Sequence, residues 1–254
     1  MKIFHICTIS NNLQQYEEMK TSFIAAGFDL EKCRYSLFDN SEKNQFDPYQ
    51  IFKVLKSTTI EPYIILCHQD LLIDKGDDFD RLFKLLTELD ELDPRWAIVG
   101  NAGISSSHGM VAKITDPNGT PKWQGALPQQ VHSLDENFLV VKTSANIASS
   151  ENLRGFHLYA TDLCLNALLN KQTCYVIDFH LTHLSGGKIG TEFWEVQSIF
   201  YQRWYPEFNF CYVQTITGVN MCFSKYKLLR AIGSQQRVKS WLSQSPLRPL
   251  VFLD

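Results

Sequence analysis

The sequence lacks the features that mark three large classes of protein. No apolar run among its 254 residues approaches the roughly 20 residues that a membrane-spanning helix needs. The 24 Lys and Arg residues stand against 27 Asp and Glu residues, without a block of like charge that could follow a nucleic-acid backbone. The serines form no Gly-x-Ser-x-Gly elbow, so nothing supports a hydrolase triad. We therefore expect no transmembrane segment and no nucleic-acid partner.

Two further absences concern cysteine spacing and a cleavage site. The seven cysteines show no Cys-x-x-Cys spacing, and Cys7, Cys67 and Cys174 lie inside apolar runs, which is typical of buried, reduced thiols. The apolar stretch at residues 3–9 leads into Ser10-Asn11-Asn12 without the small-residue pattern of a signal-peptide cleavage site. It predicts a first strand. We expect a cytoplasmic protein.

Hydrophobic periodicity alternates between strand and helix spacing along the chain. Strands are expected at residues 3–9, 34–38, 63–70, 96–100, 138–142 and 173–178. Helices are expected at residues 13–26, 49–56, 79–92, 158–169, 194–204 and 225–241. This alternation predicts an α/β fold, with a mostly parallel sheet and helices on both faces. Residues 104–134 have no sustained period and predict short strands or a mobile loop over the site. Residues 1–254 are expected to form a single domain, in which the part from about 206 to 254 is a helical C-terminal extension.

The most informative segment is the strand that runs into His68-Gln69-Asp70. Because side chains alternate along a strand, His68 and Asp70 project to one face and Gln69 to the other. Ligands of open parallel sheets bind beyond the carboxyl ends of the strands. Mg²⁺ and Mn²⁺ prefer oxygen ligands, and Mn²⁺ also accepts nitrogen, so the pair predicts a metal and phosphate site. The alternative is that both residues only close a buried strand.

Two other carboxylates occupy positions that suit chemistry. Asp39 ends an apolar strand, where a carboxylate can accept a hydrogen bond from a nucleobase or ribose, although Asp-Asn-Ser is also an ordinary turn sequence. Asp162 lies near the start of an apolar helix, whose dipole favours the ionised state that a general base needs. Alternatively, Asp162 only stabilises the start of that helix.

Two histidines close a later strand. His180 and His183 are three residues apart and face opposite ways in a regular strand, so they cannot both be ligands. His183 borders the Gly186-Gly187 pair, where an imidazole can reach a metal or a diphosphate. We therefore prefer His183 as a metal ligand and expect a structural role for His180.

Taken in order, several segments resemble family 2-type glycosyltransferases of the GT-A fold. The resemblance covers about residues 3–205 and is closest to the bacterial glycosyltransferase-like branch that carries His-Gln-Asp where others carry Asp-x-Asp. The segments that carry it are Asn11-Asn12, Phe38-Asp39-Asn40-Ser41, Cys67-His68-Gln69-Asp70, Val99-Gly100-Asn101-Ala102-Gly103, Phe156-His157-Leu158-Tyr159-Ala160-Thr161-Asp162 and His183.

The resemblance implies a GT-A-type, Rossmann-like domain with hexosyltransferase-like activity. A sugar would pass from a nucleotide-diphospho-sugar donor to the hydroxyl of a glycan, lipid-linked or small-molecule acceptor, with inversion and with a divalent cation, Mn²⁺ or Mg²⁺. The implied general base is Asp162. The implied metal ligands are Asp70, His68 and His183. The implied substrate-binding residues are Asp39, Asn12, His157 and Gly103.

The chain departs from the family pattern at two places. His68 stands where most relatives have an acidic residue, and Thr161-Asp162 stands where many have a Glu-Asp pair. A catalytically inactive relative that binds a nucleotide or a glycan is therefore one alternative. A nucleotidyltransferase is another, but it would need a Gly-rich phosphate loop with Lys or Arg after the first strand, where this chain has Ser10-Asn11-Asn12-Leu13.

Overall fold

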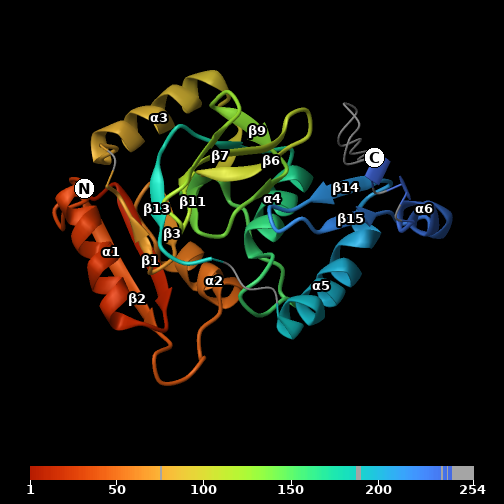
Figure 1. The fold of residues 1–254 in the computed structure, drawn as a ribbon, viewed down its shortest axis with the longest axis horizontal. Coiled ribbons are helices and arrows are strands. Elements are labelled where there is room, and N and C mark those ends of the chain that lie inside the picture. The colour runs from red at the N-terminus through yellow and green to blue at the C-terminus, as the bar shows by residue number, and fades with distance from the viewer. Residues whose placement is uncertain (75, 187–189, 236, 239, 242–254) are drawn as a thin grey trace.

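The computed structural model describes residues 1–74, 76–186, 190–235, 237–238 and 240–241. Its central sheet has seven strands in the order β2-β1-β3-β11-β5-β12-β9 (Figure 1). Five strands run in one direction, and β11 and β9 run against them. The strands are β1 (Phe4–Ser10), β2 (Cys33–Asp39), β3 (Tyr63–Cys67), β5 (Trp96–Gly100), β9 (Gln129–Val131), β11 (Phe138–Lys142) and β12 (Thr173–Val176). The expected α/β fold with a mostly parallel sheet is confirmed.

Helices cover both faces of the central sheet because its strands are apolar on both sides. Ile65 and Cys67 of β3 join the core with α1 (Leu13–Ala25) and α3 (Phe79–Leu92). Ile64 and Leu66 point the other way. The helices of that second face are α2 (Pro48–Thr58), α4 (Tyr159–Leu169) and α5 (Thr191–Trp204). Apolar residues recur every three or four positions in α3, where Leu82, Leu86 and Leu89 are buried.

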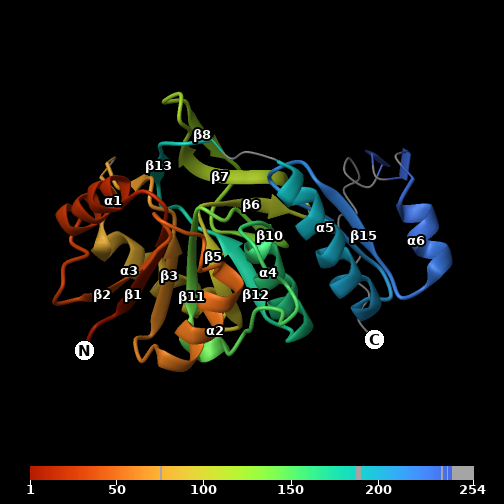
Figure 2. The ribbon, with the colours of Figure 1, turned by 90° about the horizontal axis from the view of Figure 1, so that it is seen from below.

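A second, smaller sheet lies beyond the carboxyl ends of the central strands, above them in Figure 2. Its strand order is β10-β6-β7-β13-β4, and β8 pairs with β7. The strands are β4 (Leu71–Leu72), β6 (Ala102–Ser105), β7 (Gly109–Thr115), β8 (Pro121–Gln124), β10 (Ser133–Leu134) and β13 (Leu181–His183). Of the two possibilities for residues 104–134, short strands are therefore correct.

The region after residue 206 is not only helical, which corrects the expectation for this extension. After a 3-10 turn at Tyr205–Glu207, β14 (Cys211–Gln214) and β15 (Asn220–Phe223) form an antiparallel hairpin ahead of α6 (Lys227–Gly233). Tyr212, Val213 and Phe223 are residue types that favour strands, and Gly218 takes the positive φ of 80° that the turn requires. Of the helix expected at 225–241, α6 covers Lys227–Gly233, and residues 237–238 and 240–241 are again helical, while residues 242–254 lie outside the described residues.

Two general expectations can be checked on the fold. All seven cysteines are buried, as predicted from their apolar surroundings. Within the described part of the chain, no helix combines the length and the apolar character that crossing a membrane requires. A second 3-10 turn, Thr143–Ala145, follows β11.

Candidate functional site

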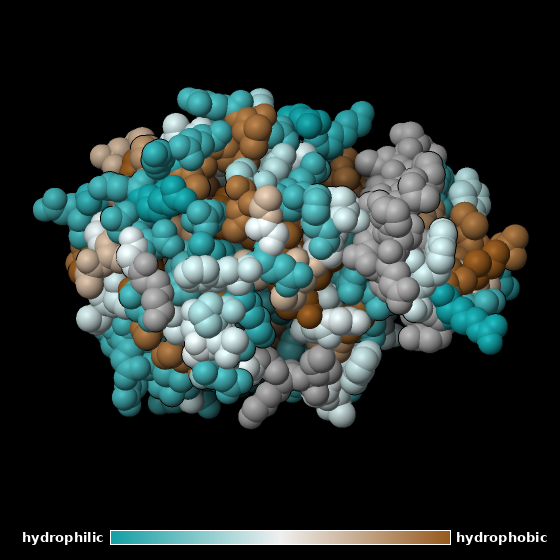
Figure 3. Space-filling view, turned by 45° about the horizontal axis from the view of Figure 1, so that its top comes forward, coloured by the Kyte–Doolittle hydropathy of each residue, from teal (hydrophilic) through white to brown (hydrophobic). Residues whose placement is uncertain are grey.

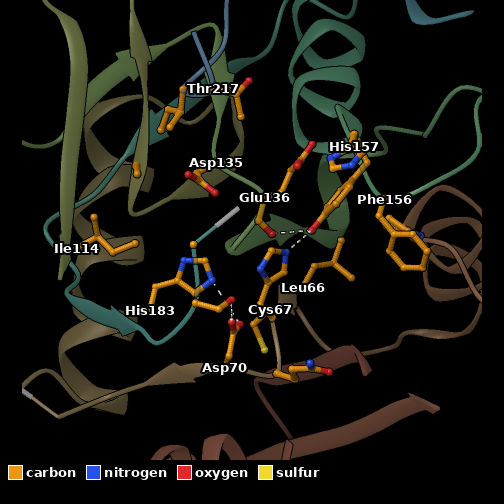
Figure 4. Close-up of a pocket in the computed structure, with 18 of the residues that line it drawn as sticks. Leu66, Cys67, Asp70, Ile114, Asp135, Glu136, Phe156, His157, His183 and Thr217 are labelled. Carbon is orange, nitrogen blue, oxygen red and sulfur yellow. Dashed lines mark hydrogen bonds and ion pairs between the residues drawn. The ribbon is translucent and has the colours of Figure 1, made fainter. Parts of the chain in front are cut away.

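A cavity of about 650 Å³ opens where the central sheet meets the second sheet (Figure 4). Its floor lies at the carboxyl ends of β1 and β3. One wall is the face of β7 that carries Met110, Ala112 and Ile114, and the opposite wall includes Phe156 and His157 ahead of α4. The crevice beyond the carboxyl ends of parallel strands is where open α/β sheets bind ligands.

Three predicted metal ligands converge on the floor of this cavity. His68 and Asp70 follow β3, and Gln69 between them turns the other way, so that its Oε1 accepts a hydrogen bond of 2.8 Å from the Asn11 amide. His183 is the last residue of β13, and the pairing of β13 with β4 sets it opposite Leu71, next to Asp70. One donor atom from each of His68, Asp70 and His183 lies within 4.8 Å of the others. Figure 4 shows His183 and Asp70 side by side.

The environment keeps Asp70 ionised and His68 neutral. His183 Nε2 lies 3.3 Å from Asp70 Oδ1, and Ser185 Oγ donates a hydrogen bond to Asp70 Oδ2. Burial opposes the charge, but the close contact with His183 and the hydrogen bond from Ser185 together lower the pKa of Asp70 to about 2. Burial, and then repulsion from His183, lower the pKa of His68.

This set of donors fits a divalent cation. A carboxylate and two imidazoles converge beneath an open cavity, which leaves room for substrate oxygens as further ligands. Imidazole suits Mn²⁺, Zn²⁺ and similar ions, whereas Mg²⁺ prefers oxygen ligands throughout, so the residues suit Mn²⁺ better than Mg²⁺. His180 is not part of the cluster, since its Nε2 lies 2.8 Å from Thr115 Oγ1. This agrees with the expected structural role.

The structure contradicts the expectation that Asp162 is the general base. The residue has 0% exposed surface, and its carboxylate accepts hydrogen bonds from Ser150 N at 2.8 Å, Ser150 Oγ at 2.6 Å and Trp204 Nε1 at 3.0 Å. Burial raises the pKa of Asp162 to about 6, against the effect of these hydrogen bonds. A carboxylate enclosed in this way does not reach an acceptor hydroxyl. Asp162 instead ties α4 to α5 and to the loop at Ser150.

Asn12 and Asp39 have local hydrogen-bond partners and do not line the cavity, whereas their neighbours Asn11 and Asn40 do. Asn12 is the N-cap of α1, where its side chain accepts hydrogen bonds from the first-turn amides. Asp39 Oδ1 accepts a hydrogen bond of 2.8 Å from Ser41 N, the turn contact that its sequence allows. Substrate binding by Asn12 and Asp39 stays a prediction, and the cavity lining favours the neighbouring residues.

Of the two other predicted substrate-binding residues, His157 lines the cavity and Gly103 does not. His157 lines the cavity, and its ring packs against that of Phe193 with a centroid distance of 5.2 Å. Gly103 lies within β6, and a Cβ atom there would lie 2.6 Å from the Ser133 carbonyl oxygen and 3.0 Å from a methyl group of Val176. The close packing of β6 on β10 explains the glycine. His157 therefore faces the cavity, whereas Gly103 does not line it.

Two acidic residues that line the cavity were not predicted from the sequence. Asp135 and Glu136 lie in the loop between β10 and β11 and line the cavity, above His183 in Figure 4. Burial, and then the nearby charge of Asp135, raise the pKa of Glu136 to about 8, so that Glu136 is largely protonated at neutral pH. The Glu136 carbonyl accepts a hydrogen bond of 2.6 Å from Tyr159 Oη. The signal in the sequence that could have revealed them is a pair of adjacent acidic residues shortly before the apolar strand β11.

Comparison with known proteins identifies a relative. No family model matches the sequence. The chain is 32% identical over 214 residues to the protein named ATP synthase subunits region ORF 6 of Fuscovulum blasticum, and the match covers 80% of this chain and 85% of that protein. This chain belongs to the same family as that protein. The relative's name states no activity, so this membership gives the chain none.

Solved structures show the likeness of the fold. Staphylococcus aureus TarS is similar with a TM-score of 0.51 and 13% identity, and the match covers 80% of this chain and 39% of TarS. The match to TarS 1–349 in complex with UDP-GlcNAc has a TM-score of 0.48 and 14% identity, and covers 80% and 66% of the two chains. A Drosophila β1,4-galactosyltransferase 7 mutant in complex with manganese, UDP-Gal and xylobiose has a TM-score of 0.43 and 10% identity, and the match covers 75% and 77%. At TM-scores below 0.5 the last two likenesses carry no weight. The likeness to TarS agrees with the expected GT-A-type fold, and the chain spans well under half of that protein.

Proposed function

We propose that this protein is a glycosyltransferase that moves a sugar from a nucleotide-diphospho-sugar to an acceptor hydroxyl, with inversion at the anomeric carbon. The observation that carries the proposal is the cluster of His68, Asp70 and His183 on the floor of a cavity at the carboxyl ends of β1 and β3. The order of the sequence motifs and the GT-A-type fold support the same activity.

The residues of the cavity divide into groups with different tasks. His68, Asp70 and His183 would hold a divalent cation, which when bound supplies positive charge against the leaving diphosphate. Asn11, which lines the cavity just beyond β1, offers polar groups to the nucleoside. The apolar face of β7 keeps water from the reacting atoms, and the two walls orient donor and acceptor.

We assign the general-base role to Asp135. Four carboxyl groups lie among the described residues that line the cavity: Asp70, Asp116, Asp135 and Glu136. Asp70 belongs to the proposed metal site, Asp116 pairs with Lys122 Nζ at 3.4 Å, and Glu136 is largely protonated at neutral pH. Asp135 is thus the carboxylate best suited to accept the proton of the acceptor hydroxyl.

A second candidate is a relative that binds the nucleotide-sugar without turning it over. The observation that favours it is the burial of Asp162, which leaves the carboxylate of the family motif outside the cavity. The cavity and the metal ligands would be retained, so the two candidates predict the same binding and differ in turnover.

Release of nucleoside diphosphate from a panel of nucleotide-sugars, with Mn²⁺ or with chelator, tests the proposal. We expect turnover with one donor class in the presence of Mn²⁺, and a fall of about 10²–10⁴-fold in rate for Asp135→Asn. Donor affinity, measured by titration calorimetry, should change little in this variant. The matched control is Asp80→Asn on the exposed first turn of α3, which should keep the parent rate. Donor binding without turnover in the parent protein would favour the second candidate, and absence of both would contradict the proposed function.

A further inference from the structure

Charge is distributed unevenly along the chain. Residues 225–254 contain six Lys and Arg residues and one acidic residue, whereas residues 1–224 contain 18 basic and 26 acidic residues. The C-terminal segment therefore carries a net charge of +5 and the rest of the chain −8, which together give the −3 of the whole protein. A basic segment on an otherwise acidic protein is typical of a segment that binds an anionic partner.

The structure fixes the start of this segment against the protein. Gly233 is buried, and a Cβ atom at this position would collide with Cys222 Sγ, so α6 packs closely on β15. The guanidinium of Arg230 lies 4.1 Å from the centre of the Tyr205 ring and donates a hydrogen bond of 2.8 Å to the Ser224 carbonyl. One side of α6 is thus anchored by a close backbone approach and a stacked cation.

The other side of α6 exposes apolar side chains. Leu228 is 71% exposed and Ile232 is 43% exposed, and their spacing of four residues puts them on one helical face. Tyr226, just before the helix, is 52% exposed. Lys225 and Lys227 are exposed beside these residues. Trp241, another exposed aromatic residue, follows in the same basic segment.

The figures place this face at one end of the molecule. α6 lies at the end opposite α1 in both ribbon views (Figures 1 and 2). In Figure 3 hydrophobic and hydrophilic residues stand side by side at that end. Single exposed apolar residues are normal on protein surfaces. Several of them close together on one short helix, beside lysines, are typical of an interaction surface.

We propose that this face of α6 and its flanking lysines bind the surface of an anionic phospholipid bilayer. Leu228 and Ile232 would enter the boundary between head groups and acyl chains, and Tyr226 would lie at the head-group level. Lys225 and Lys227 would contact the lipid phosphates while their aliphatic stems stay beside the apolar face.

The combination of side chains favours a bilayer over the other possible occupants. A nucleic acid would use the lysines but would leave Leu228 and Ile232 without a partner. A second copy of this chain would cover the apolar residues but would bring two basic segments together. An anionic lipid surface satisfies both features at once.

Sedimentation of the whole protein with lipid vesicles tests the proposal. We expect binding to vesicles that contain phosphatidylglycerol, little binding to phosphatidylcholine alone, and weaker binding at high salt. Each lysine near the surface contributes about 1 kcal/mol, or about 5-fold in partition, so Lys225→Gln with Lys227→Gln should weaken binding by about 30-fold. Leu228→Ser with Ile232→Ser should remove most of the binding that remains at high salt.

Matched control variants distinguish binding through the proposed face from nonspecific binding of exposed apolar residues. Ile60 and Leu92 are 86% and 64% exposed on other elements, and Ile60→Ser with Leu92→Ser should leave vesicle binding unchanged. Equal melting temperatures show that all variants are folded. The proposal is overturned by equal binding to both kinds of vesicle, by no binding to either, or by an effect of the control variant equal to that of Leu228→Ser with Ile232→Ser. Concentration-dependent dimers or binding to duplex DNA that the α6 variants abolish, in the absence of lipid binding, would also overturn it.

Discussion

Asp162 is a buried carboxylate whose ionisation is opposed by its surroundings. Burial raises its pKa from 3.8 to about 6, although Ser150 and Trp204 donate hydrogen bonds to it. The folded protein therefore holds this proton more tightly than the unfolded chain does. The resulting stabilisation is complete below the unfolded pKa of 3.8 and is lost as the pH rises through about 6.

This behaviour gives a stability prediction for Asp162→Asn. The parent protein should lose up to about 3 kcal/mol of unfolding free energy from this group between about pH 4 and pH 7, and the asparagine variant should lack this slope. The stability difference between parent and variant, measured by urea unfolding, should therefore shrink as the pH rises. Glu151→Gln, whose side chain is 93% exposed, is the control without such an effect. A difference that stays constant with pH would show that Asp162 does not titrate in this range.

Sequence reasoning located the cluster of His68, Asp70 and His183 because these residues lie at or just beyond strand ends. His68 and Asp70 share a face by strand alternation, and His183 ends a strand whose pairing with β4 carries it to Asp70. Asp135 was missed because β10, which precedes it, has only two residues and gives no periodic signal. Asp162 was misjudged because its position in α4 is visible in the sequence, whereas the packing of Trp204 over it is not.

At the scale of the elements, helices and strands with clear local patterns were predicted, whereas the pairing of strands far apart in the sequence was not. β11 spans Phe138–Lys142 as predicted, and α3 spans the predicted 79–92, since both have clear apolar periods. The hairpin of β14 and β15 was missed because its strands have four residues each, too few for a period to show. The second sheet was not predicted either, because its strand order depends on contacts between residues far apart in sequence.

Gly103 of β6 packs closely against β10 and β12, and its replacement tests whether the role of this glycine is packing. In Gly103→Ala the new methyl group would press on the Ser133 carbonyl of β10 and on Val176 of β12, so we expect a loss of about 1–3 kcal/mol in unfolding free energy. The affinity of the folded variant for nucleoside diphosphate should be unchanged. Gly190→Ala, at a position with no atom within 4 Å of the new Cβ, should leave stability nearly unaltered. Loss of nucleotide affinity with normal stability would instead show that Gly103 contacts substrate.

At the scale of the whole molecule, the candidate site joins the two sheets. Asp70 follows β3 of the central sheet, whereas His183 ends β13 of the second sheet, and the cavity takes its walls from both. A ligand that binds the cluster therefore makes contacts with both sheets in the folded protein only. Binding of this kind should stabilise the fold as one unit and not one sheet alone.

Thermal unfolding with Mn²⁺ and a nucleoside diphosphate tests this coupling and the metal site together. At a hundred times the dissociation constant the ligands stabilise by about 2.7 kcal/mol, which for a chain of this size raises the melting temperature by roughly 5–10 °C. Chelator should remove most of the shift, and Mg²⁺ should reproduce it only in part because two of the three proposed ligands are imidazoles. Asp70→Ala should abolish the metal-dependent part, since it removes the carboxylate of the cluster, and Asp80→Ala on the exposed first turn of α3 should retain it. An equal shift with chelator and with Mn²⁺ would show that the nucleotide binds without a cation, and a normal shift in Asp70→Ala would move the metal away from this cluster.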